Sequence, residues 1–485
     1  MIVEAEAFVD VNSPLGKLDR RCYGQFVEHL GKCIYGGIWV GEDSEIPNIK
    51  GFRKDVLEAV KALNPPIMRW PGGNFSSGYH WEDGIGPREK RPKRLDLAWG
   101  AGEPNKFGTD EFIEWCKLVE TKPFIVVNAG NGSPEEAAKW VEYCNLTRDT
   151  CYASLRQMYG HKEPYDVRLW GIGNELYGRW QVGFCVDGEE CARRTVEFAN
   201  EMQKADPSME LVAVGCEDPE WNLNMVKNAG KYFDYLSVHI YVRGGGSYRE
   251  LAAVPVDIER RLRAVYSLVE TSRRNCGIDK EIKLAFDEWN VWYPEAKAPL
   301  HEQVPNVKDA VFSGLVLNSL HRLCREVPIG GFAQTVNVLP LITTSDDGSM
   351  FVNPQYLVFK MYGENTGDQV VKAVVDAPSY YCEEPKEYVS FIDLSATLSS
   401  DGRTLYLHAV NRHEEESAEL KVMFRGFRPK TASSVFVSGG TLDDRNTFDE
   451  PDKVKIEKGE ARIVKDEAVL TVRPHSVNVM VTKQG

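Results

Sequence analysis

The 485-residue sequence lacks the features of several common protein classes. No window approaches the roughly 18 to 20 apolar residues that span a bilayer. The first residues are acidic, where a secretory signal needs a basic region and an apolar core. The net charge is −14, from 72 acidic and 58 basic residues, which disfavours nucleic acid and membrane as partners. We therefore expect a cytoplasmic protein that acts on a neutral substrate.

Signatures of metal and cofactor sites are also missing. The 11 cysteines are scattered, odd in number and never spaced as CxxC, which argues against a disulfide framework or a zinc site. The segments PGGNF (71–75) and GIGNE (171–175) contain glycine, but neither has the spacing of a dinucleotide fingerprint or a phosphate-binding loop. We expect neither a metal nor a cofactor.

Eight short apolar or aromatic runs in the first 360 or so residues predict β-strands, at 22–29, 67–71, 124–130, 167–175, 211–217, 235–241, 282–289 and 330–337. Amphipathic helices are predicted between them, at 52–63, 108–120, 131–144, 189–203, 257–271 and 307–324. Ser133 is placed as a helix N-cap before Pro134. Thr109 and Asp110 predict a helix start of the same kind in the run 108–120. This alternation predicts a (β/α)8 TIM barrel, with a doubly wound open sheet as the alternative.

The helical period disappears after about residue 365. Short alternating segments at 404–412, 418–424, 433–440, 461–474 and 476–483 predict an antiparallel, jelly-roll-like β-sandwich. Residues 3–11 alternate too. We expect residues 1–18 to add a strand to the sandwich, residues 19–364 to form the barrel and residues 365–485 to form the sandwich.

Two glutamates stand out because each follows an aromatic, apolar run: Glu175 in RLWGIGNELYG and Glu288 in IKLAFDEWNVWY. Burying a carboxylate is costly unless it has a partner or a function. In a TIM barrel the active residues stand at the C-terminal ends of the strands. Other polar residues share that predicted position: Glu28, His29, Arg69, Asn74, Asn128, Asn174, His239, Tyr241, Gln334 and Asn337.

Two carboxylates among neutral hydrogen-bonding groups and aromatic rings predict glycoside hydrolysis. One carboxylic acid protonates the leaving oxygen, while the other carboxylate attacks the sugar or activates water. The residues alone leave open which glutamate has which role. A metal-dependent barrel lyase is a distant alternative, although Glu28, Glu175, Glu217 and Glu288 would make a poor cation cage. A catalytically inactive sugar-binding protein and a purely structural pair of carboxylates are the others.

Several runs resemble the α-L-arabinofuranosidases of glycoside hydrolase family 51, collinearly from about residue 20 to 340: GQFVEHLGKCIYGGIW, NPPIMRWPGGNFSSGYHWEDGIGP, LWGIGNELYGRWQVG, FDEWNVWY and AQTVNVL. The resemblance implies a retaining, exo-acting enzyme that releases terminal arabinofuranosyl residues from arabinan or arabinoxylan oligosaccharides by double displacement. It also implies a homo-oligomer, often a hexamer. An endo-β-glucanase or β-xylosidase of the same family is the nearest alternative.

The resemblance makes Glu175 the general acid/base and Glu288 the nucleophile. We expect the pKa of Glu175 to be raised in the free enzyme and to fall once Glu288 is esterified, because the acid must first be protonated and then ionised. Arg69 and Tyr241 are expected to keep Glu288 ionised. His239 is expected to be a hydrogen-bonding neighbour and not a catalyst, because the two glutamates already supply an acid and a base.

The same resemblance assigns contacts to the sugar. Asn174 is expected at the 2-hydroxyl, Glu28 and Asn74 at the remaining furanose hydroxyls, and Gln334 at the closed side of the pocket. Three tryptophans are expected as aromatic walls or near the leaving group: Trp99, Trp292 and Trp180. Core packing is the alternative for each of these tryptophans.

Overall fold

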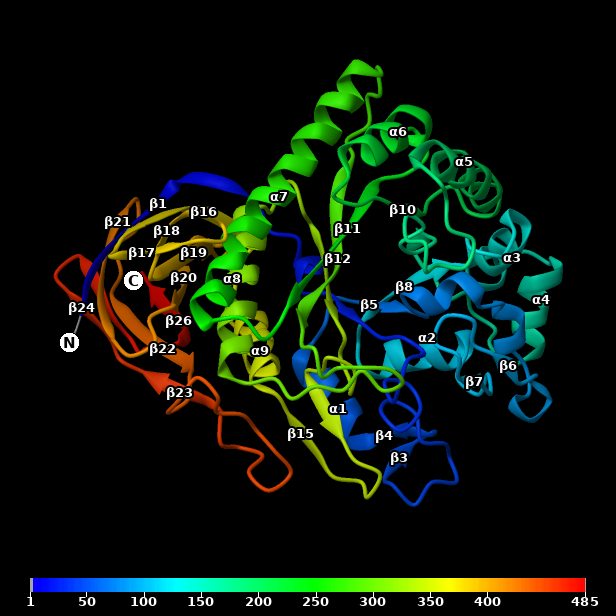
Figure 1. The fold of residues 1–485 in the computed structure, drawn as a ribbon, viewed down its shortest axis with the longest axis horizontal. Helices are drawn as coiled ribbons and strands as arrows, with labels where there is room; N and C mark the ends of the chain where they lie inside the picture. Colours follow the sequence, from blue (N-terminus) through cyan, green and yellow to red (C-terminus); the bar gives the residue numbers. More distant parts are fainter. Residues whose placement is uncertain (1–2, 485) are drawn as a thin grey trace.

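Eight parallel strands close into a barrel in the computed structural model, which describes residues 3–484 (Figure 1). In order around the barrel they are β2 (Gln25–Phe26), β5 (Ile67–Trp70), β8 (Lys122–Val127), β9 (Leu169–Ile172), β10 (Glu210–Val214), β11 (Tyr235–Arg243), β12 (Lys283–Trp292) and β13 (Ile329–Ala333). Each predicted run supplies one strand, so the barrel prediction is confirmed and the open sheet is wrong, because β13 pairs with β2.

The barrel is packed with side chains and is not a pore. One inward-facing layer contains residues from seven of the eight strands: Ile67, Phe124, Val126, Leu169, Val212, Tyr235, Ala285 and Ile329. All are buried. Such layers fill the interior of TIM barrels and leave the C-terminal ends of the strands for function.

Nine helices lie among the described residues: α1 (Lys54–Leu63), α2 (Thr109–Leu118), α3 (Pro134–Asn145), α4 (Cys151–Met158), α5 (Gly188–Ala205), α6 (Pro219–Ala229), α7 (Tyr248–Asn275), α8 (Val307–Arg322) and α9 (Pro354–Glu364). The six predicted helices are present, and α4, α6 and α9 were not predicted. Ser133 caps α3 by accepting a hydrogen bond from the Glu136 amide.

The predicted start of α2 is wrong. The N-cap is Gly108, and its amide donates to the Glu111 carboxylate. Thr109 and Asp110 serve packing instead: the hydroxyl of Thr109 accepts a hydrogen bond from the indole of Trp140, and the Asp110 carboxylate accepts from two tyrosine hydroxyls, those of Tyr143 and Tyr165. These buried contacts tie α2 to α3 and to the segment before β9.

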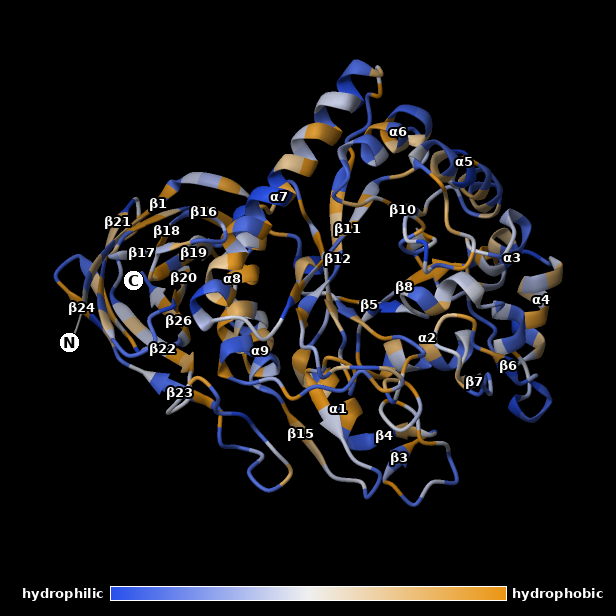
Figure 2. Cartoon of the chain, viewed as in Figure 1, coloured by the Kyte–Doolittle hydropathy of each residue, from blue (hydrophilic) through white to orange (hydrophobic). Residues whose placement is uncertain are grey.

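Two helices show how hydropathy follows position (Figure 2). Along α7, orange and blue bands alternate, and its buried apolar residues recur every three or four positions, as in Ile258, Leu262 and Val265. In α8, all residues except Lys308 and Arg322 are buried. The reason is that α8 packs between the barrel and a second unit, a large sheet.

That sheet has ten strands, in the order β23 (Ile456–Gly459), β22 (Thr431–Val437), β26 (Ser476–Lys483), β20 (Thr404–Asn411), β19 (Ile392–Leu398), β16 (Gln369–Asp376), β1 (Val3–Lys17), β21 (Ala418–Arg425), β25 (Glu467–Val472) and β24 (Ala461–Val464). All neighbours are antiparallel except β1 and β21, which are parallel. Because β22 also contacts β24, the sheet curls into two layers. The outer face of β20, β22 and β26 packs on α8 and α9.

Four two-stranded hairpins lie outside the barrel and the large sheet: β3 (Asn48–Ile49) with β4 (Phe52–Arg53), β6 (Arg94–Leu95) with β7 (Gly102–Glu103), β14 (Ile342–Thr344) with β15 (Met350–Val352), and β17 (Ser379–Cys382) with β18 (Glu387–Ser390). Short 3-10 helices are η1 (Arg20–Tyr23), η2 (Asn74–Gly78), η3 (Trp81–Gly84) and η4 (Arg88–Lys90). The loop of the β6–β7 hairpin carries Trp99, and η2 begins with Asn74. Both residues reach the mouth of the barrel.

All eleven cysteines are free thiols, and eight of them are buried. Within residues 3–484, none of the helices combines the length and the apolar character needed to cross a membrane.

Candidate active site

The carboxyl ends of the barrel strands surround a pocket of about 530 Å³. This volume is typical of small-molecule sites. Ten of the twelve site residues expected from the sequence line it: Glu28, Asn74, Trp99, Glu175, Trp180, His239, Tyr241, Glu288, Trp292 and Gln334. The other two, Arg69 and Asn174, are buried and hydrogen-bond to residues that line it. The structure therefore brings all twelve together.

An irregularity in β12 turns two consecutive carboxylates toward Arg69. Ser237 of β11 pairs with Ala285 of β12, and the next pair is His239 with Glu288. The step between the pairs is therefore two residues along β11 but three along β12. Such a bulge redirects side chains that would otherwise alternate between the two faces of a strand. As a consequence, both side chains contact Arg69. Asp287 Oδ2 lies 3.3 Å from Arg69 Nε, and Glu288 Oε1 lies 2.6 Å from Arg69 Nη1.

Glu288 accepts hydrogen bonds on both carboxylate oxygens. Arg69 Nη1 donates to Oε1 at 2.6 Å, and the Tyr241 hydroxyl donates to Oε2 at 2.8 Å. Arg69 also donates to Asn174 Oδ1 at 2.6 Å. The side chain of Glu288 is 6% exposed. The carboxylate is thus held in one orientation by two donors.

Glu175 approaches from the turn that follows β9. Gly173 has a φ of 78° and Glu175 a φ of 44°, so both residues adopt the left-handed conformation. That conformation is uncommon for a residue other than glycine and often marks a functional site. His239 Nδ1 lies 2.9 Å from Glu175 Oε1, and Trp180 Nε1 donates to Glu175 Oε2 at 3.3 Å.

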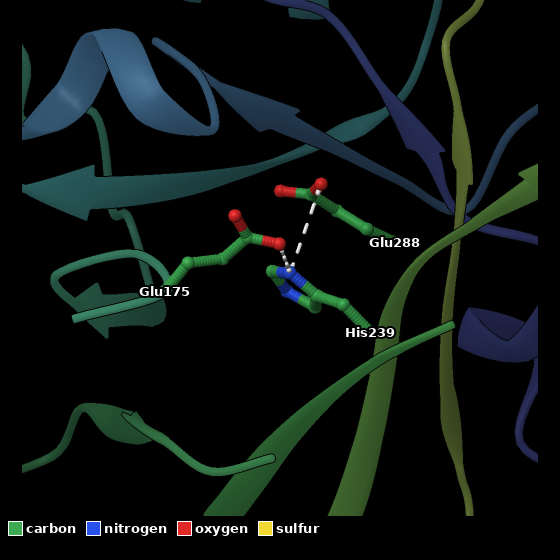
Figure 3. A group of neighbouring side chains, drawn as sticks. All are labelled: Glu175, His239 and Glu288. Atoms are coloured by element: carbon green, nitrogen blue, oxygen red, sulfur yellow. Dashed lines mark hydrogen bonds and ion pairs between the residues drawn. The ribbon is translucent and has the colours of Figure 1, made fainter. Parts of the chain in front are cut away.

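Glu175 and Glu288 face each other across the pocket, with His239 contacting both (Figure 3). His239 Nδ1 lies 3.7 Å from Glu288 Oε2. One oxygen of each glutamate and one nitrogen of His239 all lie within 4.8 Å of one another. The two carboxyl groups can therefore act on opposite sides of one small bound molecule.

The predicted direction of the Glu175 pKa shift is wrong. Burial raises the pKa of Glu175, but the hydrogen bond from His239 and the positive charge of His239 outweigh it, and the pKa is lowered. Burial lowers the pKa of His239, but the charges of Glu288 and Asp287 and the hydrogen bonds to Asp287 and Glu175 raise it to about 10. The prediction followed from the role of the acid, and the sequence did not place His239 beside Glu175.

A third carboxyl group, Glu28, lies in the same pocket. Its Oε1 accepts from the Phe75 amide at 3.0 Å and from Trp99 Nε1 at 3.1 Å, and its Oε2 accepts from Gln334 Nε2 at 2.8 Å. Burial and the charge of Glu288 raise the pKa of Glu28 to about 8. Both effects favour the protonated form of Glu28 in the free protein.

The glycines of the PGGNF segment allow Glu28 to lie there. A Cβ on Gly72 would lie 2.8 Å from Glu28 Cγ, and a Cβ on Gly73 would lie 3.0 Å from Glu28 Oε2. Any larger residue would push the carboxyl group away. The next residue, Asn74, accepts hydrogen bonds on Oδ1 from Asn174 Nδ2 at 3.2 Å and from the Gln181 amide.

The three tryptophans differ in their surroundings. Trp180 is 65% exposed and lies at the open end of the pocket. Trp292 is half-buried, donates from Nε1 to the Ala296 carbonyl at 2.9 Å and packs edge-on against Tyr241. Trp99 is half-buried and bonded to Glu28. All three rings face the cavity, so none is only a core residue.

Some polar residues at the strand ends do not line the pocket. His29 lies behind Glu28, bonded to Glu103 at 2.9 Å, whereas Asn128 and Asn337 hold loop backbone. Conversely, the sequence did not indicate Asp287, Ser237, Tyr177 or Gln181. The only signal for Asp287 was its place before Glu288, which a regular strand would direct to the opposite face.

The chemistry of the pocket suits proton transfer better than metal binding. Glu175, His239 and Glu288 lie close enough to hold an ion. However, the carboxylates around His239 raise the pKa of its ring to about 10, so an ion would have to displace a proton to bind there. Glu217, part of the alternative cation cage, is paired instead with Arg261 and lies outside the pocket.

A parallel barrel with two facing carboxylates at its C-terminal rim defines a glycoside hydrolase. Comparison with known proteins gives the family. A family model described as the α-L-arabinofuranosidase 1 domain matches residues 59–254, and one described as the α-L-arabinofuranosidase C-terminal domain matches residues 287–476. The chain belongs to the α-L-arabinofuranosidases of glycoside hydrolase family 51.

Individual relatives match over most of their length. The chain is 37% identical to α-L-arabinofuranosidase C of Emericella nidulans, over 84% of this chain and 85% of that protein. It is 32% identical to intracellular exo-α-(1→5)-L-arabinofuranosidase 1 of Bacillus subtilis, over 99% of both. The arabinose complex of the Thermotoga maritima α-L-arabinofuranosidase superposes with a TM-score of 0.92 at 40% identity, covering 99% of this chain and 100% of that one.

Proposed function

We propose that this chain is an exo-acting, retaining α-L-arabinofuranosidase that releases terminal arabinofuranosyl residues from arabinan and arabinoxylan oligosaccharides. The observation that carries the proposal is the short distance between the two carboxyl groups: one oxygen of Glu175 lies within 4.8 Å of one oxygen of Glu288. Retaining glycosidases keep their carboxyl groups about 5 to 5.5 Å apart, whereas inverting ones leave about 6.5 to 9.5 Å for a water molecule. The names of the relatives described above support the choice of sugar.

In the proposed reaction Glu288 attacks the anomeric carbon while Glu175 protonates the leaving oxygen. The C–O bond to the leaving group breaks, and an ester bond between Glu288 and the sugar forms. Water, deprotonated by Glu175, then attacks the same carbon and frees Glu288. Arg69 and Tyr241 support the nucleophile role, because both donate hydrogen bonds to the Glu288 carboxylate and hold it in place.

Glu175 must gain its proton in the complex, because its pKa is lowered in the free protein. A sugar in the pocket removes water from the carboxyl group, which favours the protonated form. After esterification, Glu288 no longer carries a negative charge, and Glu175 can ionise more easily. The acid/base cycle therefore follows the charge of Glu288.

Further contacts position the sugar. We assign the 2-hydroxyl to the free amide hydrogen of Asn174, and the other hydroxyls to Glu28 and Asn74. Gln334, bonded to Glu28, closes the far side. The aromatic walls are Trp99 and Trp292, and Trp180 faces the leaving group.

The anomer formed first tests sugar identity and retention together. Proton NMR during hydrolysis of 4-nitrophenyl α-L-arabinofuranoside should show the α-anomer of arabinose first. The β-anomer would contradict retention. Release of 4-nitrophenol from this substrate but not from the cellobioside distinguishes the proposal from an endo-β-glucanase, and the corresponding xyloside tests for a β-xylosidase. Full activity in EDTA would exclude the metal-dependent lyase.

We also propose a cytoplasmic location and a homo-oligomer, with a hexamer suggested by resemblance to the family. The Bacillus subtilis relative is named intracellular, and the eleven free thiols suit a reducing compartment. Light scattering on the purified protein would measure the number of copies, and six would agree with the proposal.

A further inference from the structure

The far side of the His239 ring is held by two residues without an assigned role. Its Nδ1 faces Glu175, while its Nε2 lies 3.0 Å from the Ser237 hydroxyl and 3.4 Å from Asp287 Oδ1. The Ser237 hydroxyl donates to the same Asp287 oxygen at 2.6 Å. Imidazole nitrogens are distinct, and the partner of one fixes the proton on the other. Asp287 and Ser237 thus govern the nitrogen that faces Glu175.

Charge balance requires His239 to be a cation. The charged groups facing it are Glu175 from the turn after β9, Asp287 and Glu288 from β12, and Arg69 from β5. Arg69 alone cannot compensate the two carboxylates of β12, which are 3% and 6% exposed. A buried carboxylate without a compensating charge is strongly unfavourable. The imidazolium supplies the second positive charge.

Asp287 differs from Glu288 in keeping its charge throughout the reaction. In the proposed function, Glu288 becomes an ester in the first step and loses its negative charge. Asp287 does not contact the pocket and is not consumed. The partner of His239 Nε2 is therefore the same in both steps, so Nδ1 keeps its proton and keeps donating to Glu175 Oε1.

We propose that Asp287 is a positioning residue that, through His239 and with the help of Ser237, decides which oxygen of Glu175 carries the transferable proton. Because Oε1 always accepts from His239, a proton on Glu175 must sit on Oε2. That oxygen lies beside Trp180, at the open end of the pocket where the leaving group departs. This inference rests on the proposed function and adds a residue that orients its acid.

Asp287→Asn tests the proposal because it removes the charge with little change in shape. His239 should become neutral, and Glu175, having lost a charged donor, should become a weaker acid. We expect the basic limb of the pH profile of kcat/KM, which reports the ionisation of Glu175, to shift to higher pH by about one unit or more. The acidic limb should not shift to higher pH. We also expect kcat to fall about 10- to 100-fold, with KM changed by less than about threefold.

Two further variants complete the test. Ser237→Ala should move the basic limb in the same direction by a smaller amount. Asp110→Asn removes another buried carboxylate, bonded to Tyr143 and Tyr165 outside the pocket, and should leave both limbs in place. If Asp287→Asn has wild-type limbs at reduced activity, Asp287 is only structural. If that variant does not fold, an unchanged Ser237→Ala profile overturns the proposal.

A readout that needs no turnover separates this inference from the proposed function. In the wild-type protein, NMR of the labelled His239 ring should show both nitrogens protonated at pH 7, and in Asp287→Asn it should show a neutral ring. A wild-type protein without arabinofuranosidase activity would end the proposed function, whatever the ring shows. A His239 ring protonated to the same extent in both proteins would end the positioning role, whatever the activity.

Discussion

Two buried histidine clusters in this molecule have opposite protonation. In the pocket, His239 faces carboxylates, and its pKa is raised to about 10. Where the barrel meets the large sheet, His321 of α8 and His408 of β20 lie with ring centroids 4.8 Å apart. Burial and the neighbouring His408 lower the pKa of His321 well below its usual value, and burial lowers the pKa of His408 to about 3.

The partners of the interface cluster are neutral. His321 bonds to the Tyr23 hydroxyl and to Ser395 Oγ, at 2.8 Å for the latter. His408 Nε2 lies 2.9 Å from the Asn365 carbonyl. Burial thus neutralises a histidine unless carboxylates oppose it. The charged groups of the pocket are suited to proton transfer, whereas the histidines between the barrel and the large sheet stay neutral.

The largest effect should come from removing the nucleophile from the charged cluster. We expect Glu288→Ala to lower kcat by at least ~10⁴-fold, because no covalent intermediate can form. His408→Gln, at the neutral cluster, should keep kcat within about twofold of the wild-type value. Steady-state hydrolysis of the nitrophenyl arabinofuranoside measures both. Comparable losses in the two variants would mean that the clusters do not differ in function.

Glu175→Ala should have the next largest effect and should depend on the leaving group. On a poor leaving group we expect kcat/KM to fall about 10²- to 10⁴-fold, since protonation assists bond breaking. On an activated aryl arabinofuranoside, added azide should restore part of the rate and give the arabinofuranosyl azide of retained configuration. Near-normal rates on a poor leaving group would refute the acid assignment.

The neutral cluster should control stability at low pH. The pKa of His408 is near 6.5 in the unfolded chain and about 3 in the folded one. Its contribution to stability is therefore fully present above pH 6.5 and is lost as the pH falls toward 3, by up to about 1.4 kcal/mol per pH unit. His408→Gln should flatten the fall of the free energy of unfolding between pH 6.5 and 4.5, measured with urea. An unaltered slope would show that His408 does not titrate as inferred.

Trp180→Phe should have the smallest effect. It removes a 3.3 Å hydrogen bond to Glu175 at an exposed position but keeps an aromatic ring. Because one such bond contributes about 0.5 to 1.5 kcal/mol, we expect a change of about two- to tenfold in kcat. Trp180→Ala, which also removes the ring, should additionally raise KM. An unchanged KM in both variants would place the leaving group elsewhere.

The sequence predicted the barrel strands and both glutamates because their signals are local. An apolar run ending in polar residues marks a buried parallel strand and its functional end. Asp287 was missed because the bulge in β12 depends on pairing with β11, which no local pattern records. The same dependence on distant partners explains the wrong pKa direction for Glu175, whose main neighbour, His239, is 64 positions away.

Other errors also arise from tertiary contacts. The helix α4 has only eight residues and buries only Ala153 and Arg156, and α9 is buried nearly all round, so neither gave a clear helical period. At α2, Thr109 looked like a cap, but its hydroxyl is used by Trp140 of the next helix. The sequence indicated that 3–11 forms a strand, but not that it runs parallel to β21.

The position of β1 constrains how the protein can be made. This first strand lies between β16 and β21 in the sheet, so both of its neighbours are synthesised only after the whole barrel. More than 350 residues separate β1 from β16, so β1 has no partner strand until long after it has been synthesised. Shortening the N-terminus would remove an interior strand and split the sheet in two, even though it touches nothing in the pocket.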